Sequence, residues 1–340
     1  MPAVSPFITA LPKTELHLHL VGSASPETVL DLSRRYPEAG LPTELDELRR
    51  FYTFRDFAHF IDVYIAVNGL VRTAQDVRTL IVGAARDAAA SNVSYVELTV
   101  TAASHLSVGI ASDDLADALT SARAEALEHH GVTMSWIFDI ASEQGVDPAW
   151  SAVRFATQQR PPGTVAFGLA GPEVGWPREM FRPHFDVARE AGLTSIVHAG
   201  ETTGPETIWS AIRDLGAQRI GHGLSAAADP DLLAYLAEHQ IAVEMCPTSN
   251  LCTRSIASIE QHPLPILLAA GVPVTISTDD PGMFATDLNR EYALAQSAFG
   301  LSDDQLADIA RTGARAALCD ETTRAALLTA IDASAVRADG

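Results

Sequence analysis

The chain has 340 residues, 47% hydrophobic and 19% charged, a composition that suits a packed core and excludes a disordered chain. The 43 acidic and 23 basic residues give a formal net charge of −20, which repels nucleic acid and anionic membranes, so we expect neither as a partner. No apolar run approaches the roughly 18 residues of a membrane-spanning helix.

The N-terminus and the cysteines predict a cytoplasmic protein. Residues 1–13 lack the basic start and apolar run of a secretory signal. Cys246, Cys252 and Cys319 form a sparse, odd-numbered set, which indicates a reducing compartment. Cys246 and Cys252 lack the spacing of a thiolate metal site, so we interpret them as a strand-end core residue and a loop residue.

Short β-rich runs alternate with Ala-rich amphipathic stretches along the chain. Several of the runs are continuously apolar, which is typical of parallel strands buried on both faces. Helix start signals, such as Ser25-Pro26, Ser112-Asp113 and Asp229-Pro230, lie between them. The strands are expected at residues 14–20, 93–100, 132–140, 165–170, 194–198, 219–222, 242–246 and 274–278.

Eight strand–helix units in one direction predict an α/β fold, a single (β/α)8 TIM-type barrel in which residues 1–340 form one domain. The loop after the first strand is long and is expected to hold extra helices near residues 56–68 and 74–91. Two or three further helices are expected after the eighth strand.

Polar residues follow several of the predicted strands, at the end where barrel enzymes build their sites. His17 and His19 share one face of the first strand because side chains alternate, although two polar residues in a loop is the other reading. His198 ends the fifth strand, and Glu201 follows three residues later. Glu201 could instead cap the helix that begins near Pro205.

Three further strand ends carry candidates of the same kind. His222 stands between two glycines, which suits a site better than a core, though a surface turn would also hold it. Asp279 and Asp280 follow a buried run, where two adjacent carboxylates are costly unless a positive charge neutralises one of them. Gly171 could offer its N–H to a planar ligand, or simply form a turn.

Together, His17, His19, His198 and Asp279 match the ligand set of a catalytic zinc site with an open position. Lys13 is the only lysine of the chain. No lysine is therefore available to bridge two metals at a middle strand, and we expect a single metal ion per chain.

These motifs, in this order, resemble the adenosine deaminase family of the amidohydrolase superfamily. The resemblance covers nearly the whole chain. It implies hydrolytic deamination of a 6-aminopurine nucleoside, a small-molecule substrate, with one Zn²⁺ held by His17, His19, His198 and Asp279. The matching stretches are residues 12–19, 198–201, 221–223, 246–250 and 277–281.

The resemblance also implies roles for the other candidates. Zinc provides hydroxide at neutral pH, which adds to the carbon that bears the amine. Glu201 would protonate the adjacent ring nitrogen, and His222 would orient or stabilise the hydroxide beside Asp279. Asp280 would bind the purine N7, and the Gly171 N–H would meet the other ring edge. The His-x-Glu and Pro-Cys-x-x-Cys pattern of cytidine-type deaminases is absent.

One segment departs from the family pattern. Where the family has an acidic residue that accepts the 5′-hydroxyl of adenosine, this chain has Val21, which cannot accept a hydrogen bond. An apolar wall there suits a 5′ position that carries carbon or sulfur. Phe57 and nearby phenylalanines could cover such a group, although helix core is the other reading. Arg55 or Arg72 could pair with a substrate carboxylate.

The predicted substrate is therefore a 5′-modified adenosine, with aminodeoxyfutalosine of menaquinone biosynthesis first. The family members that deaminate it resemble this chain at the Val-Gly-Ser segment, residues 21–23. 5′-Deoxyadenosine, methylthioadenosine and adenosylhomocysteine are weaker candidates. An adenosine or adenine deaminase of purine salvage is the alternative, and a non-catalytic barrel that binds zinc and purine is a second one. The sequence does not predict the oligomeric state.

Overall fold

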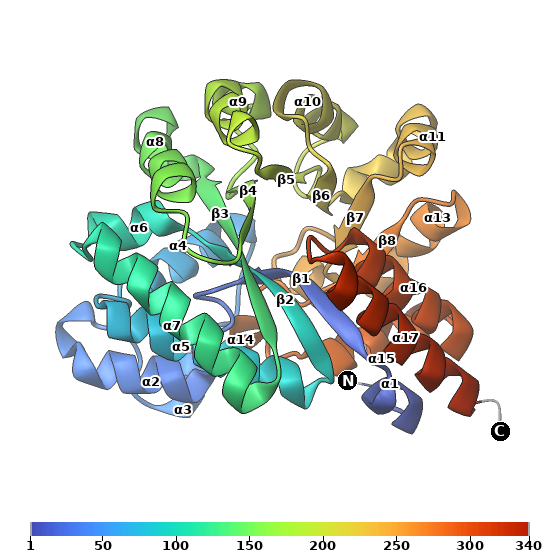
Figure 1. Ribbon diagram of the computed structural model, residues 1–340, viewed down its shortest axis with the longest axis horizontal. Helices are drawn as coiled ribbons and strands as arrows, with labels where there is room; N and C mark the ends of the chain where they lie inside the picture. The colour runs from blue at the N-terminus through green and yellow to red at the C-terminus, as the bar shows by residue number, and fades with distance from the viewer. Residues whose placement is uncertain (1, 339–340) are drawn as a thin grey trace.

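Eight parallel strands stand side by side in chain order in the computed structural model, which describes residues 2–338 (Figure 1). Each strand pairs in parallel with the next, so the predicted TIM-type barrel is confirmed. The strands are β1 (Lys13–His19), β2 (Val93–Val100), β3 (Thr133–Ala141), β4 (Thr164–Ala170), β5 (Thr194–Ala199), β6 (Arg219–His222), β7 (Ala242–Met245) and β8 (Val274–Ile276).

The barrel closes between β1 and the segment after β8. A parallel bridge joins Leu18 to Asp279, and the Asp279 N–H donates to the His17 carbonyl at 3.0 Å. The strand predicted over residues 274–278 ends earlier, at Ile276, because the chain then bends to bring Asp279 against β1. Closure therefore fixes the position of a candidate site residue.

Helices cover the outside of the strands (Figure 1). The predicted helices near residues 56–68 and 74–91 are α4 and α5, capped by Asp56 and Thr73. In chain order the helices are α1 (Pro6–Ala10), α2 (Pro26–Arg35), α3 (Leu45–Phe51), α4 (Phe57–Asn68), α5 (Ala74–Ala90), α6 (Ala102–Ser107), α7 (Ser112–His130), α8 (Val146–Arg154), α9 (Arg182–Glu190), α10 (Pro205–Leu215), α11 (Pro230–Glu238), α12 (Pro247–Cys252), α13 (Leu264–Ala269), α14 (Pro281–Phe284), α15 (Leu288–Phe299), α16 (Asp303–Ala316) and α17 (Glu321–Ala338).

The segment after β8 holds four helices, α14 to α17, where two or three were expected. The additional one is α14, a single turn of four residues that begins directly after Asp280. Such a short turn gives no periodic signal in a sequence, since helical periodicity needs several turns to show.

The interior of the barrel is partly apolar and partly charged. Ile137, Ala166 and Ile196 form a small buried cluster of their own. Charged side chains are also buried on the barrel strands, among them Arg219 on β6 and Glu244 on β7. Buried charges persist only when they are paired or serve a ligand, so the charged part of the interior indicates where to look for a site.

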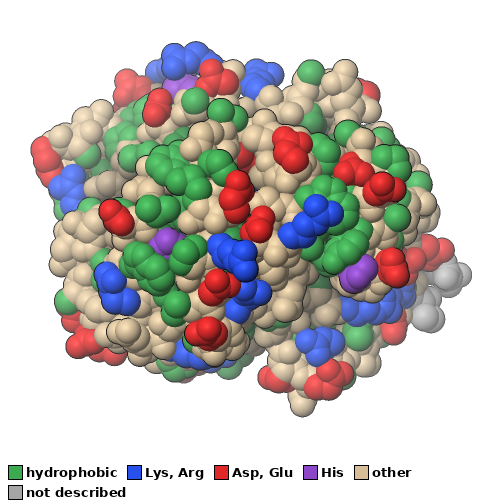
Figure 2. All heavy atoms as spheres, turned by 90° about the horizontal axis from the view of Figure 1, so that it is seen from above, with side chains coloured by type: hydrophobic (Ala, Val, Ile, Leu, Met, Phe, Trp, Pro, Cys, Tyr) green, Lys and Arg blue, Asp and Glu red, His purple; other side chains and the backbone are tan. Residues whose placement is uncertain are grey.

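The outer surface adds two observations. In the part of the chain that the structure describes, no helix combines the length and apolarity needed to cross a bilayer. Figure 2 shows one face of the molecule, on which acidic and basic side chains are interspersed with hydrophobic ones and do not form a broad basic patch.

Candidate metal centre and active site

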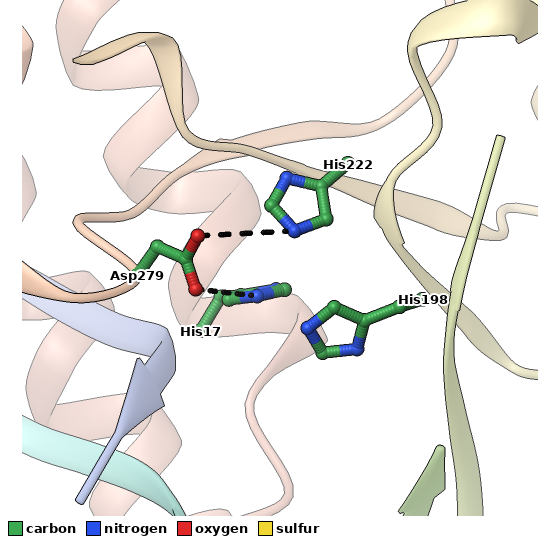
Figure 3. A group of neighbouring side chains, drawn as sticks. All are labelled: His17, His198, His222 and Asp279. Carbon is green, nitrogen blue, oxygen red and sulfur yellow. Dashed lines mark ion pairs between the residues drawn. The ribbon is translucent and has the colours of Figure 1, made fainter. Parts of the chain in front are cut away.

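Four side chains meet at the carboxyl end of the barrel, as Figure 3 shows. His17 comes from β1, His198 from β5, His222 from β6, and Asp279 from the bend after β8. One ligand-type atom from each lies within 4.8 Å of the others. Residues that are up to 262 positions apart in the sequence thus form one compact group of nitrogen and carboxylate donors.

The backbone is strained where it presents two of these side chains. His222 has φ +61° and Asp279 has φ +66°, a left-handed conformation that costs free energy for residues other than glycine. Gly221 lies against the cluster, and a Cβ on it would come within 2.8 Å of His17 Cε1. Strain and a required glycine at one spot indicate that the arrangement serves a function.

His19 lies beside the same group. Its Nε2 is 3.1 Å from His198 Nε2 and 3.3 Å from Asp279 Oδ1. The structure therefore brings together all four predicted ligands, His17, His19, His198 and Asp279, and adds His222 as a fifth group within reach. Geometry alone leaves both His19 and His222 available as the fourth ligand.

The protonation states suit a divalent cation. Burial lowers the pKa of His19 and of His222 to about 4, and that of His198 well below its usual value, so these imidazoles are neutral and keep a free lone pair at pH 7. Burial acts to raise the pKa of Asp279, but its contacts with His17 and the other histidines hold it well below its usual value. Neutral imidazoles and an ionised carboxylate are the ligands that zinc prefers.

One buried atom of the cluster, His17 Nε2, has the properties expected of a metal ligand. His17 Nε2 is buried and makes no hydrogen bond, although it lies 3.3 Å from Asp279 Oδ1. Burial lowers the pKa of His17, but the contacts with Asp279 and Glu244 outweigh it and raise that pKa to about 10. A positive charge is thus favoured at this spot, and a metal ion would supply it while giving the orphaned nitrogen a partner.

A buried ion-pair network supports the cluster from below. His17 Nδ1 lies 2.9 Å from Glu244 Oε2. Arg219 Nε donates to the other oxygen of Glu244 at 2.6 Å, and its Nη2 donates to Glu97 at 2.5 Å. The sequence motifs do not assign Glu97, Arg219 or Glu244 to the site. Charged residues inside the short apolar strands β6 and β7 were the signal that could have found them.

Two polar side chains of α12 hold the upper part of the cluster. The Ser249 hydroxyl donates to Asp279 Oδ2 at 2.6 Å. Asn250 Nδ2 lies 3.2 Å from His222 Nδ1, and Asn250 Oδ1 lies 3.2 Å from His262 Nε2. With Asn250 donating, His222 carries its own proton on Nε2, the nitrogen that faces the cluster.

Glu201 lies at the edge of this cluster of potential metal ligands as a buried acid. Its Oε2 is 3.7 Å from His222 Nε2, and the Ser255 hydroxyl donates to its Oε1 at 3.1 Å. Burial, together with the charges of Asp279 and Glu173, raises the pKa of Glu201 well above its usual value. Glu201 therefore holds a proton more readily than a free carboxyl group, which suits a proton donor.

Glu173 holds the loop that carries Glu201. Its carboxylate accepts the N–H groups of Gly200, Glu201 and Thr202 at 2.7 to 2.8 Å. Arg178, fully buried, donates to backbone carbonyls at the ends of both β4 and β5. The sequence shows only a turn here, so neither residue was predicted to belong to the site.

A cavity opens above the cluster, and its lining includes the predicted residues Glu201, Asp280, Gly171 and Phe57. Burial and the charge of Asp279 raise the pKa of Asp280 well above its usual value, and its Oδ1 has no hydrogen-bond partner. Gly171 has φ +84°, and a Cβ there would clash with its neighbours. Both residues thus offer a donor to a ligand.

Three residues predicted to contact the substrate, Val21, Arg55 and Arg72, do not line this cavity. Val21 is buried at 3% exposure, directly before Gly22, whose backbone packs against Asp280. Arg55 is exposed, just before the N-cap of α4. Arg72 pairs with Glu38. The apolar wall of the cavity comes instead from α4 itself, through Phe57, Phe60, Ile61 and Ile65.

Comparisons with known proteins agree with this geometry. Residues 12–334 match the family model described as adenosine deaminase. An aminodeoxyfutalosine deaminase of Streptomyces avermitilis is 49% identical over 96% of this chain and 92% of that protein. An adenine deaminase structure from Arthrobacter aurescens, 29% identical, superposes with a TM-score of 0.90 over 95% of this chain and 99% of that one. An amidohydrolase structure from Burkholderia ambifaria, with bound zinc, is 27% identical and superposes with a TM-score of 0.90. The match covers 100% of this chain and 97% of that one.

Proposed function

The chain belongs to the adenosine deaminase family, and from that premise we propose that it hydrolyses the 6-amino group of a 5′-modified adenosine. The products are ammonia and the corresponding 6-oxopurine nucleoside. The observation that carries this proposal is the placement of a buried acid with a raised pKa, Glu201, beside a cluster of potential metal-ligand atoms in the lining of a cavity.

His17, His19, His198 and Asp279 would hold one zinc ion per chain, with His222 beside it. When bound, the ion acidifies a water molecule and so supplies a nucleophile at neutral pH. The zinc in the Burkholderia ambifaria relative supports this choice of metal. Because Asn250 would donate to His222 Nδ1, the His222 proton lies on Nε2. That proton would point towards the attacking oxygen and orient this oxygen.

Glu201 would act as the acid. It donates its proton to N1 of the purine, which makes the neighbouring carbon C6 electrophilic. Addition of the nucleophile at C6 would then give a tetrahedral adduct that carries both the hydroxyl and the amino group. The hydroxyl proton passes to the amino group, the C6–N bond breaks to release ammonia, and the C6 carbonyl of the 6-oxopurine forms while N1 keeps its proton. Ser255 holds one oxygen of Glu201, so that the other faces the reacting centre.

The remaining acceptors of the ring find donors in the same cavity. Burial and the charge of Asp279 raise the pKa of the Asp280 carboxyl, which would donate to N7. The Gly171 N–H would meet N3, where the lack of a Cβ lets the base approach the backbone. Three ring nitrogens are therefore matched by three donors, which is the recognition that a neutral purine requires.

The 5′ group would lie against α4. Phe57 and Ile65 present apolar surface to the cavity, and no Lys or Arg side chain of residues 2–338 lines it. Such a wall favours a 5′ substituent with carbon or an aromatic ring over a bare hydroxyl. With the 49% identity to an aminodeoxyfutalosine deaminase, this supports aminodeoxyfutalosine, and thus menaquinone biosynthesis, as the first candidate.

Deamination of adenosine or of free adenine is the second candidate, favoured by the overall similarity to the Arthrobacter adenine deaminase. A panel of 6-aminopurines that differ only at the 5′ position, read out by ammonia release from the zinc-loaded protein, separates the two. We expect 5′-substituted nucleosides to have the highest kcat/KM. Faster turnover of adenosine or adenine than of every 5′-substituted analogue would overturn the substrate proposal.

A further inference from the structure

Two carboxyl side chains that line the cavity, Asp139 and Glu143, take no part in the proposed deamination. Asp139, near the carboxyl end of β3, is 2% exposed, and its Oδ1 has no hydrogen-bond partner. Glu143 follows in the next turn, and its Oε2 is likewise buried without a partner. Both side chains line the cavity together with Glu201. Because a buried polar atom without a partner is costly, these two oxygens indicate contact with a ligand.

A second metal ion does not explain them. Within residues 2–338, the group of side chains placed to hold a metal is His17, His198, His222 and Asp279, and it includes neither carboxyl. The cavity is also lined by no Lys or Arg side chain of the same residues. The cavity therefore offers these two oxygens no cationic side chain as a partner, and hydroxyl groups of a bound molecule could donate to them.

The position of Glu143 shows which part of that molecule lies nearby. A Cβ on Gly171 would come within 2.3 Å of Glu143 Oε2, so this carboxyl lies directly beside the backbone that would meet the purine N3. In a purine nucleoside, a single carbon separates N3 from N9, the nitrogen that carries the sugar. The groups next to Glu143 are therefore those of the sugar.

We propose that Asp139 and Glu143 form a ribose subsite, in which their carboxyl oxygens accept hydrogen bonds from the 2′- and 3′-hydroxyls. The subsite rests on the proposed function, since that function sets the orientation of the purine. It deepens that function by selecting a ribonucleoside over a deoxynucleoside or a free base.

The selection follows from the cost of leaving the carboxyls unpaired. A substrate that lacks one hydroxyl still excludes water from the cavity but offers no donor, so a buried acceptor stays unsatisfied. We expect kcat/KM for such a substrate to fall by about 10- to 100-fold.

The test uses three nucleosides with the same 5′ group and a ribo, 2′-deoxy or 3′-deoxy sugar, each assayed with the zinc-loaded protein. We expect the wild type to prefer the ribonucleoside to at least one deoxy analogue. In Asp139→Ala and Glu143→Ala, turnover of the ribonucleoside should fall to the deoxy level, with the deoxy analogues little changed. Asn and Gln at these positions keep an acceptor and should restore part of the preference. Asp147→Asn, an exposed carboxyl on α8, is the matched control and should change nothing.

Equal kcat/KM for all three sugars in the wild type would overturn the subsite, as would an equal loss on all three in the alanine variants, which would mean a structural role. Calorimetric binding of the ribo and deoxy forms of the 6-oxopurine product keeps the two proposals separate. Absence of ammonia release from every substrate would contradict the proposed function. The subsite would then be tested by whether the protein binds the ribo form of the product more tightly than the deoxy forms.

Discussion

The Nδ1 atom of His17 lies 2.9 Å from Oε2 of Glu244, and both side chains are buried. This contact fixes the His17 ring and leaves its Nε2 facing Asp279. A carboxylate behind a metal-binding histidine orients the ring and raises its basicity. Because Arg219 binds the same carboxylate, the orientation of His17 is anchored to the charged interior of the barrel.

Replacement of Glu244 by Gln should weaken zinc binding by about 10- to 100-fold, because the amide cannot hold the His17 ring as the carboxylate does. Competition with a chromophoric chelator measures this affinity. Glu238→Gln, at the exposed end of α11, is the control. Wild-type zinc affinity in Glu244→Gln would show that the contact does not position the ligand.

Alanine substitutions of His19 and His222 should have different effects on zinc binding and on turnover. His19→Ala removes a ligand and should lower zinc affinity by on the order of 100-fold or more. His222→Ala should keep the metal and lose turnover, because it removes the group that orients the attacking oxygen. Metal analysis of the purified variants distinguishes them. A metal-free His222→Ala beside a metal-loaded His19→Ala would reverse our assignment.

Glu201→Gln should lower kcat by about 10²- to 10⁴-fold, because the amide cannot deliver a proton to the purine ring. Zinc content should stay at the wild-type level, since Glu201 is not a proposed ligand. Stopped assays of ammonia release, paired with metal analysis, check both statements. Glu206→Gln, an exposed neighbour on α10, should behave as wild type. An unchanged kcat in Glu201→Gln would remove this residue from the mechanism.

Glu173 makes folding stability depend on pH. Burial opposes its ionisation, but the charge of Arg178 and the bonds from Thr203 and backbone N–H groups outweigh burial and lower the pKa of Glu173. A carboxyl whose pKa is lower in the folded protein stabilises it fully above its unfolded pKa of about 4.3 and loses this contribution as pH falls further. Glu173→Gln should therefore cost about 2 kcal/mol at pH 7 and progressively less below about pH 4.

Urea unfolding of the wild type and of Glu173→Gln across this pH range measures the difference. Glu190→Gln, an exposed residue at the end of α9, serves as the control. A difference between wild type and Glu173→Gln that grew as the pH fell would contradict the assigned ionisation.

Phe57→Ala should reduce kcat/KM for a nucleoside with an aromatic 5′ substituent by about 10-fold, because part of the apolar wall is lost. Adenosine should be affected far less, since its 5′-hydroxyl gains little from that wall. Ile266→Ala, an exposed apolar residue on α13, is the control. Equal losses for both substrates would place Phe57 in folding and not in substrate choice.

The sequence predicted the barrel and the convergence of the main site residues, because strand ends are marked by local patterns. His17 and His19 alternate on one strand, and Asp279 and Asp280 follow an apolar run, so the common rim of a barrel brings them together. These features depend on neighbours in the chain and on one fold rule, and they can be read without coordinates.

Other parts of the site depend on tertiary contacts. Glu173 binds a loop 27 or more residues away, and Glu244 contacts His17 across 227 positions. A charge inside a short apolar strand marks Glu244 as unusual, but nothing in the local sequence identifies the partner of either residue. The position of Val21 relative to the cavity also depends on tertiary structure. The chemistry of this residue can be read from the sequence, but the structure buries Val21 outside the cavity lining, and α4 forms the apolar wall.

A zinc titration of the metal-free protein examines the proposed metal-dependent deamination without any substitution. The purified protein is stripped with a chelator, and ammonia release from a 5′-modified adenosine is then followed as zinc is added back. We expect no turnover without metal and full activity at one equivalent of zinc per chain. Turnover that persists in the stripped protein, or a zinc-loaded protein that releases no ammonia from any 6-aminopurine, would contradict it.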